Sequence, residues 1–108
     1  MNLIKLYEMA EKEMVPGYHA KFVHSENVTL AYWSIEEGNA LPKHAHPHEQ
    51  VVNLLEGSFE ITVDEEVLIL KPGSVVVIPS NVMHSGKALT SCRIIDVFYP
   101  IRTDYIQK

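Results

Sequence analysis

The sequence contains a single cysteine, Cys92, which excludes an intrachain disulfide. It has no run of lysine or arginine, and fourteen acidic against nine basic residues give a formal net charge of -5. This balance argues against a nucleic-acid partner and against binding to an anionic membrane. No apolar stretch approaches the roughly 20 residues that span a bilayer. Acidic residues interrupt the N-terminal segment MNLIKLYEMAEKEM, which a signal peptide does not tolerate, so we expect a cytoplasmic protein.

The 108 residues have the length of one domain, and we expect 1–108 to form one, with a barrel core from about 15 to 100. A chain this short buries a modest fraction of its surface, and a second subunit would cover more apolar area. We therefore expect a homodimer.

From Gly17 onward, runs rich in β-branched and aromatic residues alternate with turn residues, as in all-β barrels and sandwiches. The expected strands are 18–24, 28–35, 50–55, 58–63, 67–70, 74–78 and 91–99. Residues 1–14 fit either a helix, because Leu3, Leu6 and Met9 would form one stripe, or an edge strand. The tail, 104–108, is expected to be loosely held.

The segment 44–50 contains three of the six histidines and a glutamine. In an extended chain, residues two apart project to the same side, so His44 and His46 can face one ion. Gln50 has the same parity and follows a probable bend at Pro47. We interpret His48 and Glu49, which fall outside this pattern, as surface residues or as supports for the ligands.

A fourth ligand, His84, follows the strand 74–78 and a turn at Asn81, where we expect a positive φ that asparagine tolerates. His44, His46, Gln50 and His84 are thus predicted to hold one divalent transition-metal ion. Imidazole and amide ligands suit iron, manganese, nickel, cobalt and zinc alike. Four neutral ligands leave the ion its full charge, which favours binding of anionic oxygen and Lewis-acid chemistry over redox chemistry.

The last strand places Asp96 on the same face as Cys92, Ile94 and Phe98, so a carboxyl group should point into the barrel. Burial raises the pKa of such a group and nearby cations lower it, which is common in proton-transfer residues. Asp96 is therefore our acid/base candidate, and the alternative is that it only orients a metal-ligating histidine. Arg102 would either clamp a substrate carboxylate or be solvated.

The histidine segments 38–57 and 73–84, separated by 15 residues, resemble the two motifs of the cupins, which are double-stranded β-helix (jelly-roll) barrels. Gln50 and Asn81 depart from the usual glutamate and glycine of those motifs. HPHEQ, together with Asp96, Phe98, Pro100 and Arg102, is similar to the pectin-degradation (KdgF-like) cupins.

This resemblance implies linearisation of 4,5-unsaturated uronates from pectin or alginate to 5-keto-4-deoxyuronate. It implies His44, His46, Gln50 and His84 on the metal, and Asp96, Phe98 and Arg102 at a site for a small anionic sugar acid. Two alternatives stay open. One is a metal-dependent dioxygenase acting on a small organic acid, which the neutral ligands favour less. The other is a non-enzymatic sugar-binding cupin, which the fold alone does not exclude.

Overall fold

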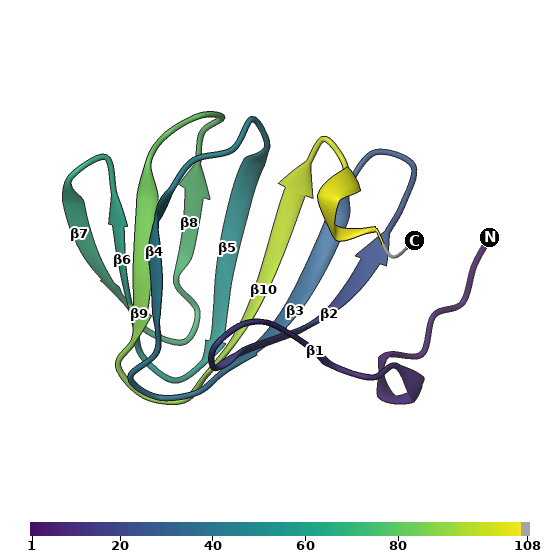
Figure 1. The fold of residues 1–108 in the computed structure, drawn as a ribbon, viewed down its shortest axis with the longest axis horizontal. Helices are drawn as coiled ribbons and strands as arrows, with labels where there is room; N and C mark the ends of the chain where they lie inside the picture. The colour runs from purple at the N-terminus through teal and green to yellow at the C-terminus, as the bar shows by residue number, and fades with distance from the viewer. Residues whose placement is uncertain (107–108) are drawn as a thin grey trace.

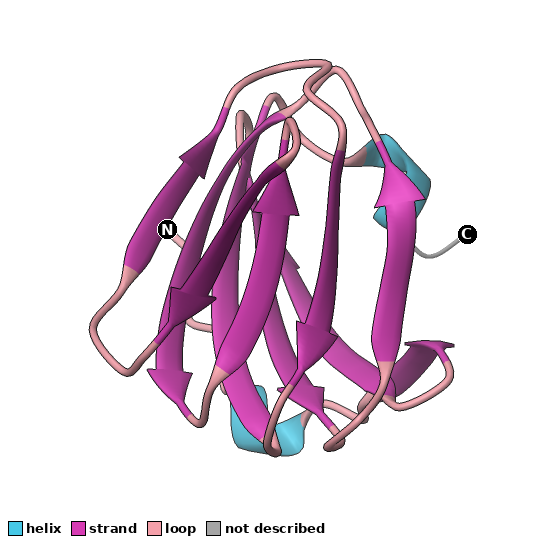
Figure 2. Ribbon diagram, turned by 90° about the vertical axis from the view of Figure 1, so that its left-hand side faces the viewer, coloured by secondary structure: helices cyan, strands magenta, loops and turns pink. Residues whose placement is uncertain are grey.

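Two antiparallel sheets face each other in the computed structural model, which describes residues 1–106 (Figures 1 and 2). The strand order is β1-β2-β3-β10-β5-β8 in one sheet and β4-β9-β6-β7 in the other. The strands are Lys12–Val15 (β1), Tyr18–His24 (β2), Thr29–Ile35 (β3), Ala40–His44 (β4), Glu49–Glu56 (β5), Phe59–Val63 (β6), Glu66–Leu70 (β7), Val75–Ile78 (β8), His84–Ala88 (β9) and Cys92–Tyr99 (β10). The all-β expectation is confirmed. Within 1–106, no helix has the length and apolar character needed to cross a membrane.

All seven expected strands are present, and each end lies within one residue of its expected position. Asn81 has the expected positive φ of 64°. The structure adds β4 and β9, whose sequences, ALPKH and HSGKA, lack β-branched residues. Pairing of β4 with β9, and of β9 with β6, keeps both segments extended. These two strands matter because each carries a predicted metal ligand.

The structure decides between the two alternatives for the N-terminal segment and corrects the expectation for the C-terminal tail. A single 3-10 turn, Leu6–Glu8 (η1), precedes β1, which pairs with β2 as an edge strand, so the helical alternative is wrong. At the other end, Thr103–Tyr105 (η2) packs back onto the barrel, and the ring of Tyr105 lies 4.6 Å from that of Phe22. A loosely held tail is therefore wrong for 104–105, while 107–108 lie outside the described residues.

The core lies between the sheets, where inward-facing residues alternate with outward-facing ones along β5, β6 and β10. In β10 the buried positions are Cys92, Ile94, Asp96 and Phe98, as the sequence pattern predicted. Cys92 and Ile94 belong to the apolar core cluster. Asp96 and Phe98, further along the strand, are buried outside that cluster. Phe98 pairs in register with Gln50 of β5, so the last strand and the glutamine ligand candidate meet.

Candidate functional site

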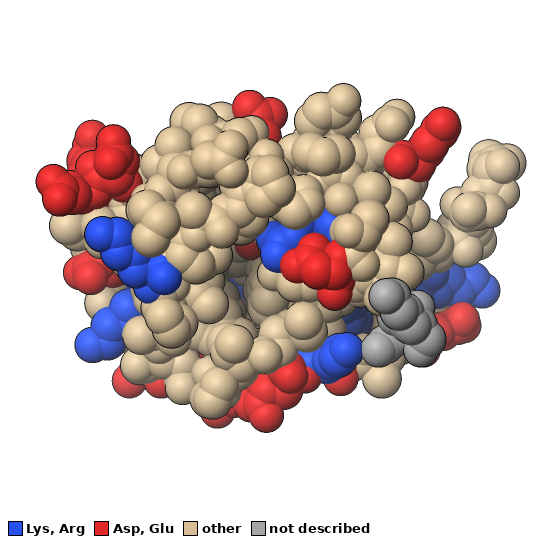
Figure 3. All heavy atoms as spheres, turned by 45° about the horizontal axis from the view of Figure 1, so that its top comes forward, with Lys and Arg blue, Asp and Glu red and all other residues tan. Residues whose placement is uncertain are grey.

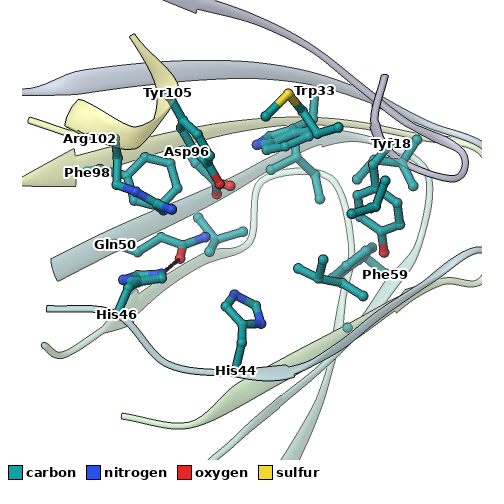
Figure 4. A pocket seen from close by; sticks show the side chains of 17 residues that line it. Tyr18, Trp33, His44, His46, Gln50, Phe59, Asp96, Phe98, Arg102 and Tyr105 are labelled. Carbon is teal, nitrogen blue, oxygen red and sulfur yellow. Dashed lines mark hydrogen bonds between the residues drawn. The ribbon is translucent and has the colours of Figure 1, made fainter. Parts of the chain in front are cut away.

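A cavity of about 170 Å³ lies between the sheets. Its lining combines predicted site residues with apolar side chains, as Figure 4 shows. The lining residues include His44, His46, Gln50, Asp96, Phe98 and Arg102, together with Tyr18, Trp33, Phe59 and Tyr105. The space-filling view shows a hollow in the face formed by the strand ends and their loops, with basic and acidic atoms side by side at its rim (Figure 3).

Three histidines from different segments meet at this cavity. His44 ends β4 and pairs in register with His84, the first residue of β9, while His46 lies in the following loop. The ring centroids of His44 and His84 are 4.2 Å apart, and that of His46 is 5.0 Å from His84 and 5.7 Å from His44. One nitrogen from each ring lies within 4.8 Å of the other two, so the three could hold one metal ion.

Backbone carbonyls fix the protonation of all three rings. The Nδ1 atoms of His44, His46 and His84 lie 2.8, 3.0 and 2.9 Å from the carbonyl oxygens of residues 42, 48 and 82. A carbonyl only accepts hydrogen bonds, so each Nδ1 carries the proton and donates it. Each Nε2 therefore presents a lone pair, which is the arrangement that a metal-ligating histidine requires.

Two further contacts fit a cation. Nε2 of His46 lies 3.0 Å from Oε1 of Gln50, and with the proton on Nδ1 both atoms present lone pairs (Figure 4). Nε2 of His84 is buried and has no hydrogen-bond partner among residues 1–106. Two lone pairs in contact and an orphaned ring nitrogen are unfavourable alone, and a shared positive ion would stabilise both.

Burial keeps two of these imidazoles, those of His46 and His84, neutral. Burial, with help from the charge of Arg102 and from His84, lowers the pKa of His46 to about 4. Burial also lowers the pKa of His84. Metal ligation needs the neutral ring, so the site does not have to expel protons from these two histidines near pH 7.

Asp96 lies deep in the cavity and is only 6% exposed. Burial raises the pKa of its carboxyl to about 7, although the side chains of Gln50 and Trp33 and the charge of Arg102 act in the opposite direction. Its Oδ1 has no hydrogen-bond partner among residues 1–106. The alternative that Asp96 orients a histidine ligand is wrong, because backbone carbonyls hold the Nδ1 atoms of all three candidate ligands.

Arg102 is buried at 7% exposure, so the alternative of a solvated surface arginine is wrong. Asp104 accepts hydrogen bonds from Nε at 3.0 Å and from Nη2 at 2.7 Å. The guanidinium carbon lies 4.7 Å from the ring centre of Phe98 and 4.0 Å from that of Tyr105. With one edge of the guanidinium on Asp104 and two aromatic rings packed beside it, the other edge remains as a donor pair for a carboxylate.

The remaining histidines serve other contacts. His48 is half-buried, and its carbonyl accepts the Nδ1 proton of His46, in agreement with a supporting role. The ring of His24 is hydrogen-bonded to the hydroxyl of Thr29. His19 forms an exposed ion pair with Glu36 at 2.8 Å, outside the cavity.

Sequence reasoning placed Phe98 at the site but missed the other phenylalanine, tyrosine and tryptophan residues of the cavity lining, Tyr18, Trp33, Phe59 and Tyr105. Trp33 has the same parity as the buried Ala31 and Ile35, and that alternation could have identified it. Tyr105 reaches the cavity only because η2 folds back onto the barrel. The hydrophobic pattern of the sequence does not predict that turn.

A family model described as "Cupin domain" matches residues 31–98. That span includes His44, His46, Gln50, His84 and Asp96. The chain is also 29% identical over 98 residues to "Pectin degradation protein KdgF" of Dickeya dadantii (strain 3937), covering 88% of this chain and 89% of that protein.

Solved structures agree with this likeness. The structure of KdgF from Halomonas sp. matches with a TM-score of 0.93 at 27% identity, covering 98% of this chain and 99% of the other. A further structure, described as an RmlC-like cupin from Shewanella frigidimarina NCIMB 400, shares the fold with a TM-score of 0.92 at 23% identity, over 98% and 96% of the two chains. The resemblance expected from the sequence is confirmed.

Proposed function

This chain belongs to the cupin family, and we propose that it linearises 4,5-unsaturated uronates derived from pectin or alginate to 5-keto-4-deoxyuronate. The observation that carries the proposal is the environment of Asp96. This residue has a buried carboxyl with a pKa of about 7, in one cavity with a histidine cluster and a fixed guanidinium. The likeness to two proteins named KdgF, one of them described as a pectin degradation protein, supports the substrate class.

The dimensions of the cavity suit a monosaccharide. An apolar cavity of about 150 Å³ accommodates one benzene ring. The cavity volume of about 170 Å³ is therefore close to what one six-membered ring needs. Arg102 would hold the substrate carboxylate with its free edge, while Phe98 fixes one face of that guanidinium.

His44, His46, Gln50 and His84 would hold one divalent ion, which when bound supplies Lewis-acid polarisation of substrate oxygens. The other tasks belong to the protein. Gln50 interacts with two residues of the site. Its oxygen faces His46, and its side chain also lies beside Asp96, where it lowers the pKa of the carboxyl. A glutamate at position 50 would put a second carboxylate beside Asp96.

Asp96 would transfer one proton in each direction. Its carboxylate takes the proton of the anomeric hydroxyl, the C1–O5 bond breaks as the C1 carbonyl forms, and the electron pair remains on O5 as an enolate. The carboxylic acid then returns the proton to C4 while the C5 carbonyl forms. The product is an isomer of the substrate, and a pKa near 7 suits both directions of transfer.

The test is an NMR time course with unsaturated galacturonate and guluronate. We expect the wild type to accelerate ring opening and Asp96→Asn to lose about 100- to 10,000-fold in kcat with its metal retained. Asp64→Asn, in an exposed turn outside the cavity, is the matched control. Full activity of Asp96→Asn would contradict the proposal. Oxygen uptake would identify the dioxygenase, and binding without turnover the sugar-binding protein.

A further inference from the structure

Two buried polar atoms in the cavity have no role in metal binding. Nε1 of Trp33 and Oδ1 of Asp96 are both buried, and neither makes a hydrogen bond of good geometry among residues 1–106, although the indole lies close enough to the carboxyl to lower the pKa of Asp96. Leaving such an atom unpaired is unfavourable, so native proteins retain few of them without a cause. Both residues line the cavity, which makes a ligand the natural partner.

The sheet register brings the two groups together. Asp96 of β10 pairs with Ala31 of β3, and Ile94 pairs with Trp33, so the indole lies one inward-facing position along from the carboxyl. In Figure 4 the indole nitrogen lies on the side of the ring that faces Asp96.

The indole is held firmly in this position. Its ring makes edge-to-face contacts with Tyr18, at 6.1 Å and 78°, and with Phe22, at 6.0 Å and 88°. The donor is therefore oriented before any ligand arrives, which reduces the entropy lost on binding.

We propose that Trp33 and Asp96 form a subsite for one ring hydroxyl of the sugar-acid ligand. The hydroxyl accepts a hydrogen bond from Nε1–H of Trp33 and donates one to Oδ1 of Asp96. A hydroxyl is the sugar substituent that satisfies both atoms, whereas a ring oxygen or carbonyl only accepts and a methylene does neither. The choice of ligand rests on the proposed function, but the donor–acceptor pair does not.

The test is calorimetric titration of the zinc-loaded protein with galacturonate, which lacks the 4,5 double bond, and with analogues in which the C1, C2 or C3 hydroxyl is replaced by hydrogen. In the wild type, one analogue should bind about 5- to 150-fold more weakly, equivalent to about 1–3 kcal/mol. In Trp33→Phe, galacturonate should lose most of that affinity while the same analogue binds as in the wild type. Tyr32→Phe, on the opposite face of β3, is the matched control.

A second measurement does not depend on a variant. Trp33 is the only tryptophan, so the ¹⁵N-labelled protein gives one indole N–H signal. That signal should move when galacturonate binds, and it should move much less with the weak analogue. The subsite would be overturned if Trp33→Phe lowered the affinity for every ligand equally. It would also be overturned if the indole N–H signal did not shift when galacturonate binds.

The two proposals can fail separately. A protein that binds this series as expected but does not open the unsaturated ring would keep the subsite and lose the proposed reaction. Failure of galacturonate itself to bind would overturn the subsite for this ligand class.

Discussion

Replacing Asp96 with asparagine should make the metal-free protein more stable, and increasingly so as the pH rises. The carboxyl is 6% exposed and has a pKa of about 7 in the folded protein, against 3.8 for an ordinary aspartate. Between these two values the folded chain holds a proton that the unfolded chain has lost. Stability therefore falls as pH rises through this window and stays at its lower level above about pH 7.

The magnitude follows from the pKa difference of about three units at about 1.4 kcal/mol per unit, which gives about 4 kcal/mol. Asparagine cannot ionise, so this loss is absent from Asp96→Asn. His46, whose pKa of about 4 adds stability as pH rises from 4 towards 6.5, is present in both proteins and cancels in the difference.

The assay is urea unfolding of both proteins in chelator from pH 4 to pH 8, followed by the fluorescence of Trp33. The free energy of unfolding of Asp96→Asn minus that of the wild type should increase by about 4 kcal/mol between pH 4 and pH 7, then level off. Asp64→Asn should show no such trend. Parallel pH profiles for wild type and Asp96→Asn would refute the claim that burial keeps this carboxyl protonated.

Other consequences follow from the same contacts. Asp104→Asn weakens the hold on Arg102 and should raise KM for the unsaturated uronate by about 5- to 10-fold, with a smaller change in kcat, measured by steady-state kinetics. Gln50→Glu places a carboxylate beside Asp96 and should raise the pKa of Asp96, which would appear as an upward shift in the pH profile of turnover. Zinc at 100 times its Kd should stabilise the wild type by about 2.7 kcal/mol in thermal melts, and His44→Ala should lose most of this gain.

Much of the fold could be predicted from local pattern, because strands with one buried face show it in their alternation. Phe59 and Ile61 point inward, as their spacing implied. Strands β4 and β9 escaped prediction because their residues do not alternate and pairing with neighbours holds them extended. Local pattern also does not reveal the fold-back of Tyr105, which depends on tertiary contacts with Phe22 and Arg102.

The candidate site divides in the same way. Parity in an extended chain placed His44 and His46 together, and the structure brings them to His84. The backbone carbonyls that orient the rings, and the partner that fixes Arg102, depend on geometry that no spacing encodes. The sequence identifies Asp96 because it is the one polar residue on an otherwise apolar strand face. The direction of its pKa shift follows only from its burial in the structure.

The central claim is that His44, His46, Gln50 and His84 bind one divalent ion, and metal content of the purified protein tests it most directly. We predict one transition-metal ion per chain in the wild type and in His19→Ala, and a content close to zero in His84→Ala. Full metal content in His84→Ala, or none in a correctly folded wild type after incubation with zinc, would contradict the account.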